Sequence, residues 1–154
     1  MNSNLVQIIT VNPLTWESGY DYLLQAFSKA VMNKPHNLFL TIVGDGPLYA
    51  AIEYTIEDLK IDKNVNIIRE TSDSNKICKL IDAADVYINV SVKYESNSAD
   101  LQAILSGKRI IFSDINKFFI NTTNSINSNK INSRDVRHLS KLISVYKNNT
   151  WQIK

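Results

Sequence analysis

The sequence predicts an α/β fold, a Rossmann-like doubly wound parallel sheet with helices on both faces. Strand-like apolar segments alternate with amphipathic helix-like segments along most of the chain. Residues 38–43 are apolar without alternation, which is typical of a parallel strand that is covered on both faces. Gly44 and Gly46 then form a turn, and Pro47 opens a helix where its missing N–H has no intrahelical partner. Ligands of such sheets bind at the carboxyl ends of the strands.

The first half of the chain contains three predicted strands and two predicted helices. In the first helix, apolar side chains recur at i, i+3 and i+4 spacing, from Tyr22 and Leu23 to Ala26, Phe27 and Ala30. The predicted order is strand 5–11, helix 19–32, strand 38–43, helix 49–60 and strand 64–68.

The second half continues the alternation. Asn97 or Ser98 is suited to cap a helix that runs to Ser106, where Gly107 stops it. The predicted order is helix 74–83, strand 85–90, the capped helix, strand 109–112 and a last helix over 135–146. Residues 121–132 are rich in Asn, Ser and Thr and predict a loop.

Composition limits the functional classes. The 154 residues suit a single domain over 1–154, and 44% hydrophobic with 21% charged residues is typical of globular proteins. A net charge of +2 does not favour a nucleic-acid partner. The sequence shows no long apolar segment, so we expect no transmembrane span and a cytoplasmic location. Cys78 is the only cysteine, which excludes an internal disulfide and a cysteine-based metal cluster.

Five segments resemble one family in the same order along the chain. The most recognisable is V-G-D-G-P-L at 43–48; the others are W-E-S-G-Y-D-Y-L-L-Q-A-F at 16–27, N-V-N-I-I at 64–68, A-A-D-V-Y-I-N-V-S at 83–91 and L-Q-A-I-L-S-G-K-R-I-I at 101–111. Together they resemble the retaining GT-B glycosyltransferases of the family 4, or group 1, type.

The resemblance implies the C-terminal, donor-binding half of such an enzyme. The donor would be a UDP- or GDP-sugar, and the acceptor a sugar, glycan or lipid, as in polysaccharide biosynthesis. It implies no metal or other cofactor. The partner would be a missing N-terminal acceptor-binding domain, through which any peripheral membrane contact would be made. A chain that lacks that domain is expected to be inactive, because half of a cleft neither excludes water nor holds an acceptor.

The departures from the family concern charge. Pro13 and Ser18 stand where the family usually has an Arg and a Lys that neutralise the donor diphosphate. Gln102 replaces the acid that grips the ribose hydroxyls, and its amide is still able to bond to a hydroxyl. Glu95 lies one position nearer than the family's first acid. Arg69 replaces a glycine and is a candidate to restore part of the lost positive charge.

We therefore expect a donor site without an assigned catalytic residue. Its candidates are the glycine turn, the start of the helix near residue 98 and the residues discussed above: Asn12, Ser18, Gly44, Asp45, Gly46, Arg69, Glu95, Ser96, Asn97, Ser98 and Gln102. A plain turn, simple helix caps and a surface glutamine are the alternatives to these roles. Trp16 is expected to pack under the first helix. The alternative function is a degenerate, non-catalytic Rossmann module used for protein–protein interaction.

Overall fold

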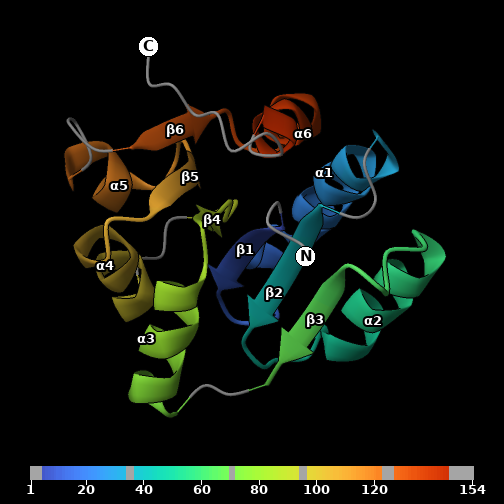
Figure 1. Cartoon of the computed structure of the whole chain (residues 1–154), viewed down its shortest axis with the longest axis horizontal. Coiled ribbons are helices and arrows are strands. Elements are labelled where there is room, and N and C mark those ends of the chain that lie inside the picture. The colour runs from blue at the N-terminus through green and yellow to red at the C-terminus, as the bar shows by residue number, and fades with distance from the viewer. Residues whose placement is uncertain (1–4, 34–36, 70–71, 94–96, 123–126, 146–154) are drawn as a thin grey trace.

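The fold is built on one parallel sheet. The computed structural model describes residues 5–33, 37–69, 72–93, 97–122 and 127–145. Their six strands lie in the order β3-β2-β1-β4-β5-β6, and every neighbouring pair is parallel (Figure 1). The strands are β1 (Val6–Val11), β2 (Leu38–Val43), β3 (Val65–Ile68), β4 (Val86–Asn89), β5 (Arg109–Ser113) and β6 (Ser128–Ile131).

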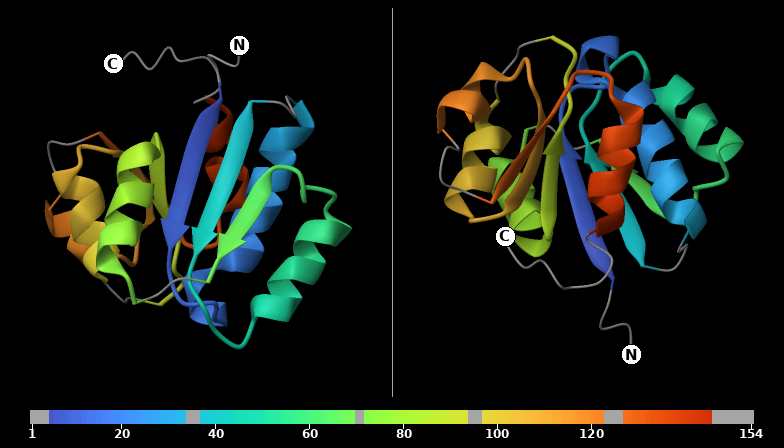
Figure 2. Two further views of the ribbon diagram at one scale, coloured as in Figure 1. Left: turned by 60° about the horizontal axis from the view of Figure 1, so that its bottom comes forward. Right: turned by 90° about the horizontal axis from the view of Figure 1, so that it is seen from above.

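Helices cover both faces of this sheet, which confirms the predicted fold class. One face carries α1 (Tyr20–Asn33), α2 (Tyr49–Asp58) and α6 (Val136–Val145), and α6 packs against α1. The other face carries α3 (Ser74–Ala83), α4 (Ser98–Leu105) and α5 (Lys117–Thr122). Figure 2 shows the sheet between these two helical layers. A short 3-10 turn, η1 (Trp16–Ser18), precedes α1.

Alternating strand residues fill two separate cores. Ile8 and Leu40 belong to the cluster under α1, whereas Ile9 and Tyr87 belong to the cluster under α3 and α4. All four side chains are at most 1% exposed. This burial on both faces explains why the strand segments read as apolar runs instead of an alternating pattern.

The strand order reverses between β1 and β4, and the pairing there is short. β1 pairs with β2 over its whole length, from Val6 to Val11. It pairs with β4 only through Ile8 and Ile9, opposite Val86 and Tyr87. Beyond these pairs, hydrogen bonds among the side chains of Asn12, Asn89 and Asn97 link this part of the carboxyl edge of the sheet. This reversal is the point at which sheets of this type bind ligands.

Two elements in the second half were not predicted. Residues 121–132, expected to be a loop, contain the edge strand β6, whose sequence S-N-K-I offers one fully apolar side chain for a strand pattern. The six-residue helix α5 is too short to show helical periodicity. The last helix was predicted over 135–146 and is observed as α6 up to Val145, with residue 146 outside the described residues.

Candidate functional site

A cavity of about 220 Å³ opens where β1 and β2 end and α4 begins. Five predicted site residues line it: Asn12, Gly44, Asp45, Asn97 and Ser98. The remaining lining residues are Pro13 and four apolar residues that the sequence analysis did not single out, Val11, Val43, Ile77 and Ala99. Of the lining residues that the structure describes, Asp45 alone is charged. The cavity therefore combines apolar walls with a few polar groups, as small-molecule sites do.

The glycine turn serves mainly to bring two loops into backbone contact. A Cβ on Gly44 would lie 2.0 Å from the carbonyl oxygen of Asn12, and one on Gly46 would lie 2.7 Å from that of Leu14. The backbone N–H of Leu14 donates to the carbonyl of Asp45 (2.9 Å). Both glycines were predicted to belong to the donor site. In the structure the close neighbour is the loop that follows β1, and Gly44 still forms part of the cavity wall.

Four polar side chains close a hydrogen-bonded ring behind the cavity. Asn12 donates to Asn89 (3.3 Å), and Asn89 donates to the Oδ1 atom of Asp100 (2.9 Å). Asp100 accepts from the backbone N–H of Asn97 (3.3 Å) through Oδ2. The amide of Asn97 donates to Oδ1 of Asn12 and to the carbonyl of Val11, both at 3.0 Å. Both amide hydrogens of Asn97 are thus used within the protein, and the ring fixes two walls of the cavity.

Asp100 is the site residue that the sequence analysis missed. It is fully buried, and its Oδ1 atom also accepts the Tyr87 hydroxyl at 2.7 Å. Burial raises the pKa of Asp100 from its ordinary value, although the hydrogen bonds from Tyr87, Asn89 and Asn97 act in the opposite direction. Burial, followed by the charge of Asp100, raises the pKa of Tyr87. Asn97 and Asp100 form a capping box, so the spacing Asn-x-x-Asp was the signal available in the sequence.

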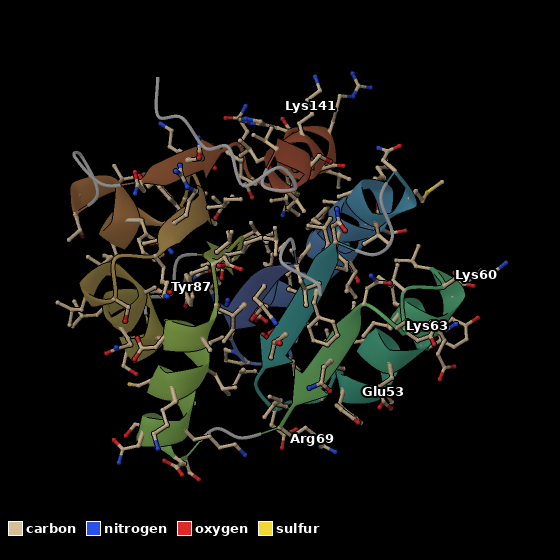
Figure 3. The ribbon with its side chains drawn as sticks, in the orientation of Figure 1. Glu53, Lys60, Lys63, Arg69, Tyr87 and Lys141 are labelled. Atoms are coloured by element: carbon tan, nitrogen blue, oxygen red, sulfur yellow. The ribbon has the colours of Figure 1, made fainter. Side chains whose placement is uncertain are left out.

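Arg69 is already engaged by another member of the predicted site. Its Nε and Nη2 atoms donate to Oδ1 of Asp45 at 3.0 and 2.8 Å, and the same oxygen accepts the N–H of Gly46 at 2.8 Å. The hydrogen bond from Arg69 holds the pKa of Asp45 below its ordinary value. The guanidinium carbon also lies 4.0 Å from the centre of the Tyr49 ring. Figure 3 shows Arg69 at the carboxyl end of β3, and Arg69 does not line the cavity.

Several other predicted residues do not reach the cavity. Ser18 is 6% exposed, and its hydroxyl donates to the carbonyl of Pro13 (2.6 Å). Gln102 donates to the hydroxyl of Ser106 (2.9 Å), one turn further along α4. Neither residue lines the cavity, nor does Gly46, so the structure does not bring these three to the ligand space. Glu95 and Ser96 lie outside the described residues.

Trp16 corrects an expectation. The sequence analysis placed it under the first helix, but its side chain is 63% exposed. It belongs to η1, in the loop between β1 and α1 at the carboxyl edge of the sheet. The apolar side chain that this loop buries is that of Leu14, which is fully buried.

A metal-binding cluster and a membrane-spanning helix are both absent from the described residues. No group of three or more His, Cys, Asp or Glu residues in the described ranges is placed to hold a metal ion. Within the same ranges, no helix has the length and apolarity that crossing a membrane requires.

Comparison with known proteins assigns the chain to a family. Residues 2–121 match the family described as glycosyl transferases group 1. The chain belongs to this family. Recognition of group 1 glycosyltransferases from the five sequence segments is thereby confirmed. No curated protein sequence matches the chain significantly.

Several solved structures share the fold of this chain. A TarM mutant from S. aureus, in complex with fondaparinux, alpha-GlcNAc-glycerol and UDP, is 19% identical, with a TM-score of 0.81 over 95% of this chain and 29% of that chain. WaaG, a glycosyltransferase involved in lipopolysaccharide biosynthesis, is 18% identical, with a TM-score of 0.80 over 94% of this chain and 38% of that chain. HepE from Anabaena, in complex with UDP and glucose, is 17% identical, with a TM-score of 0.78 over 94% of this chain and 39% of that chain. The chain thus spans less than two-fifths of these three structures.

Proposed function

We propose that this group 1 glycosyltransferase chain is the donor-binding domain of its enzyme and binds a UDP- or GDP-sugar in the cavity at the end of β1 and β2. The observation that carries the proposal is the convergence of Asn12, Gly44, Asp45, Asn97 and Ser98 on one cavity at the reversal of strand order. Two structural neighbours, TarM and HepE, form complexes with UDP, which supports the choice of ligand.

The cavity suits positioning better than covalent chemistry. Val11, Val43 and Ile77 offer apolar contact to a base or sugar ring, and Asn12 and Ser98 offer hydrogen bonds. We propose that residues 1–154 form one domain and that a separate N-terminal domain supplies the acceptor site. Transfer would then depend on orientation of the donor and on charge stabilisation at the leaving diphosphate. We place this reaction in the cytoplasm, in the synthesis of a polysaccharide or glycolipid, without a metal cofactor.

A cation at Pro13 tests the location of the site. Pro13 is exposed and lines the cavity, so Pro13→Arg should strengthen UDP binding about tenfold, as expected for one charge-assisted contact. Uridine, which lacks the diphosphate, should bind unchanged. Calorimetric titration of both proteins with both ligands measures the two effects. A lysine at the buried position of Ser18 is a poorer test, because it would displace the hydrogen bond to Pro13.

A matched control separates a local charge from net charge. Gln25→Arg adds the same charge on an exposed position of α1, outside the lining of the cavity. It should leave UDP binding within about twofold of the unmodified chain because solvent and salt screen distant charges. Equal gains for Pro13→Arg and Gln25→Arg would show that UDP responds only to overall charge.

The isolated chain is expected to lack transfer activity. The chain spans less than two-fifths of the three structures compared above. On the proposed function it would supply one side of a cleft whose other side belongs to the acceptor-binding domain. Incubation with UDP-glucose should release UDP no faster than buffer does, as measured by chromatography. Release above the buffer rate, abolished by a Gly44→Ala change, would contradict this expectation.

Two features favour the non-catalytic interaction module as the second candidate. Arg69 is committed to Asp45, and Trp16 exposes 63% of its side chain at the edge of the sheet where ligands bind. A module of this kind would bind neither nucleoside nor nucleotide in the cavity. Absence of any calorimetric or amide-shift response to uridine, UDP and GDP would therefore favour it over the donor-binding domain.

A further inference from the structure

The charges around the cavity are arranged unfavourably for a diphosphate. Of the described lining residues, Asp45 is the one with a charged side chain, and its partner Arg69 is held outside the lining. A second carboxylate, Asp100, lies buried directly behind the wall that Asn97 and Ala99 form. An anion placed in the cavity would therefore lie near two carboxylates, and the described lining contains no cationic side chain to offset them.

The buried carboxylate also acts on the helix whose start forms that wall. The N-terminal end of an α-helix carries partial positive charge and commonly binds anions. In α4 this end already has an anion of its own, since Asp100 lies in the first turn and accepts the N–H of Asn97. Tyr87 and Asn89 hold the carboxylate in place from β4 (Figure 3 shows Tyr87). The attraction of the helix start for a second anion is thereby reduced.

The uncharged contacts of the cavity remain intact. The ring fixes the amides of Asn12 and Asn97, and Val11, Val43 and Ile77 provide apolar contact. Such a wall distinguishes ring shape and hydroxyl position through neutral hydrogen bonds, which do not need a charged ligand.

We propose that Asp100 is a specificity-determining residue that makes this cavity select an uncharged nucleoside over the corresponding nucleoside diphosphate. The proposal rests on the proposed function, because it concerns the same cavity. Asp100 acts through the start of α4 and through Asn97, without touching the ligand itself. This chain binds the nucleoside part of a donor, and the diphosphate adds nothing to the affinity of the cavity for the ligand.

The experiment compares ligand preference in matched variants of the full chain. Asp100→Asn removes the charge and keeps an oxygen that is able to accept from Tyr87 and Asn89, whereas its N–H2 group does not accept the backbone N–H of Asn97. Asp85→Asn makes the same change of charge at the opposite edge of the sheet, where Asp85 accepts the N–H of Gln7. Uridine, UDP and methyl glucoside are titrated by calorimetry and by amide shifts at one pH and one ionic strength.

We expect the unmodified chain to bind UDP no more tightly than uridine, and methyl glucoside more weakly than both. Asp100→Asn should tighten UDP binding about five- to tenfold, a size consistent with loss of one partly screened charge near the cavity. Uridine should change by less than about twofold, and Asp85→Asn should change neither. A merely structural role for Asp100 would shift UDP and uridine together.

Four outcomes would overturn the inference, and they distinguish its failure from failure of the proposed function. UDP binding tenfold tighter than uridine in the unmodified chain, or equal shifts of both ligands in Asp100→Asn, would refute the role of Asp100 while the donor site stands. Binding of methyl glucoside without binding of uridine or UDP would refute the claim that the cavity binds a nucleoside. Failure of all three ligands to bind would refute the proposed function and this inference with it.

A second variant keeps the test decisive if Asp100→Asn does not fold. Asp45→Asn removes the other carboxylate at the cavity and frees Arg69 from its ion pair. Each carboxylate repels a bound diphosphate, so Asp45→Asn should also raise the ratio of the affinity for UDP to the affinity for uridine. An unchanged ratio would show that local charge does not set the preference.

Discussion

Gly44→Ala should lower the free energy of unfolding by about 3 kcal/mol, at the upper end of the range for overpacking in a closely packed site. The new Cβ would lie 2.0 Å from the carbonyl oxygen of Asn12. That contact is with backbone, so a rotamer change gives no relief, and the turn after β2 must separate from the loop after β1. Urea unfolding followed by circular dichroism measures the loss. Amide shifts should concentrate in these two loops and in the cavity.

Gly107→Ala is the control for Gly44→Ala. Gly107 has a positive φ of 67°, but a Cβ there meets nothing within 4 Å. Gly107→Ala should therefore lower the free energy of unfolding by only about 1 kcal/mol, which is the backbone penalty of a left-handed conformation for a residue with a Cβ. If both changes cost the same, the two loops are not in contact as described.

Asp100→Ala should destabilise the protein by about 3 kcal/mol or more. The change leaves three donors without their acceptor: the buried Tyr87 hydroxyl, the buried Asn89 amide and the half-buried backbone N–H of Asn97. An unsatisfied buried donor costs about 1–3 kcal/mol, and part of this cost is offset because a buried charge also disappears. Thermal and urea unfolding of the variant measure the sum.

Asp100→Asn is the comparison that isolates the hydrogen bonds. It retains a side-chain oxygen at the position of Oδ1 for Tyr87 and Asn89, but its N–H2 group faces the backbone N–H of Asn97, so it should recover part of the stability that Asp100→Ala loses. Burial raises the pKa of Asp100, so loss of the charge itself is not expected to destabilise the protein. Equal losses in the two variants would mean that the hydrogen bonds to Oδ1 contribute little.

The sequence predicted the parts of the fold whose signals are local. Apolar runs marked β1, β2, β4 and β5, and the spacing of Leu23, Ala26 and Phe27 marked α1, because burial imposes a period that sequence shows directly. β6 was missed because Asn129 and Lys130 are held in the strand by pairing with β5, a contact distant in sequence. Its strand state is a tertiary effect, which local propensity does not encode.

The candidate site was predictable in position and less so in its contacts. The glycine turn and the cap at Asn97 were recognised from short motifs, and the cavity lies between them. The glycine-turn motif could not show that Arg69 is paired with Asp45, since the two residues lie 24 positions apart in the sequence. Nor could it show that Asp100 accepts from Tyr87 and Asn89, which read as ordinary positions of a strand.

The short pairing of β1 with β4 has a consequence for the cooperativity of the molecule. Strands β3, β2 and β1 form one hydrogen-bonded block and strands β4, β5 and β6 another. Within the sheet, two residue pairs and the adjacent hydrogen bonds between Gln7 and Asp85 join the blocks, and α6 packs against α1. At the carboxyl edge the junction is made by side chains of Asn12, Asn89 and Asn97. Side-chain contacts break more locally than a backbone ladder, so this junction is where the sheet would divide into two foldons. The ligand cavity lies on that dividing line, so an occupant contacting both sides would couple the stability of one block to that of the other.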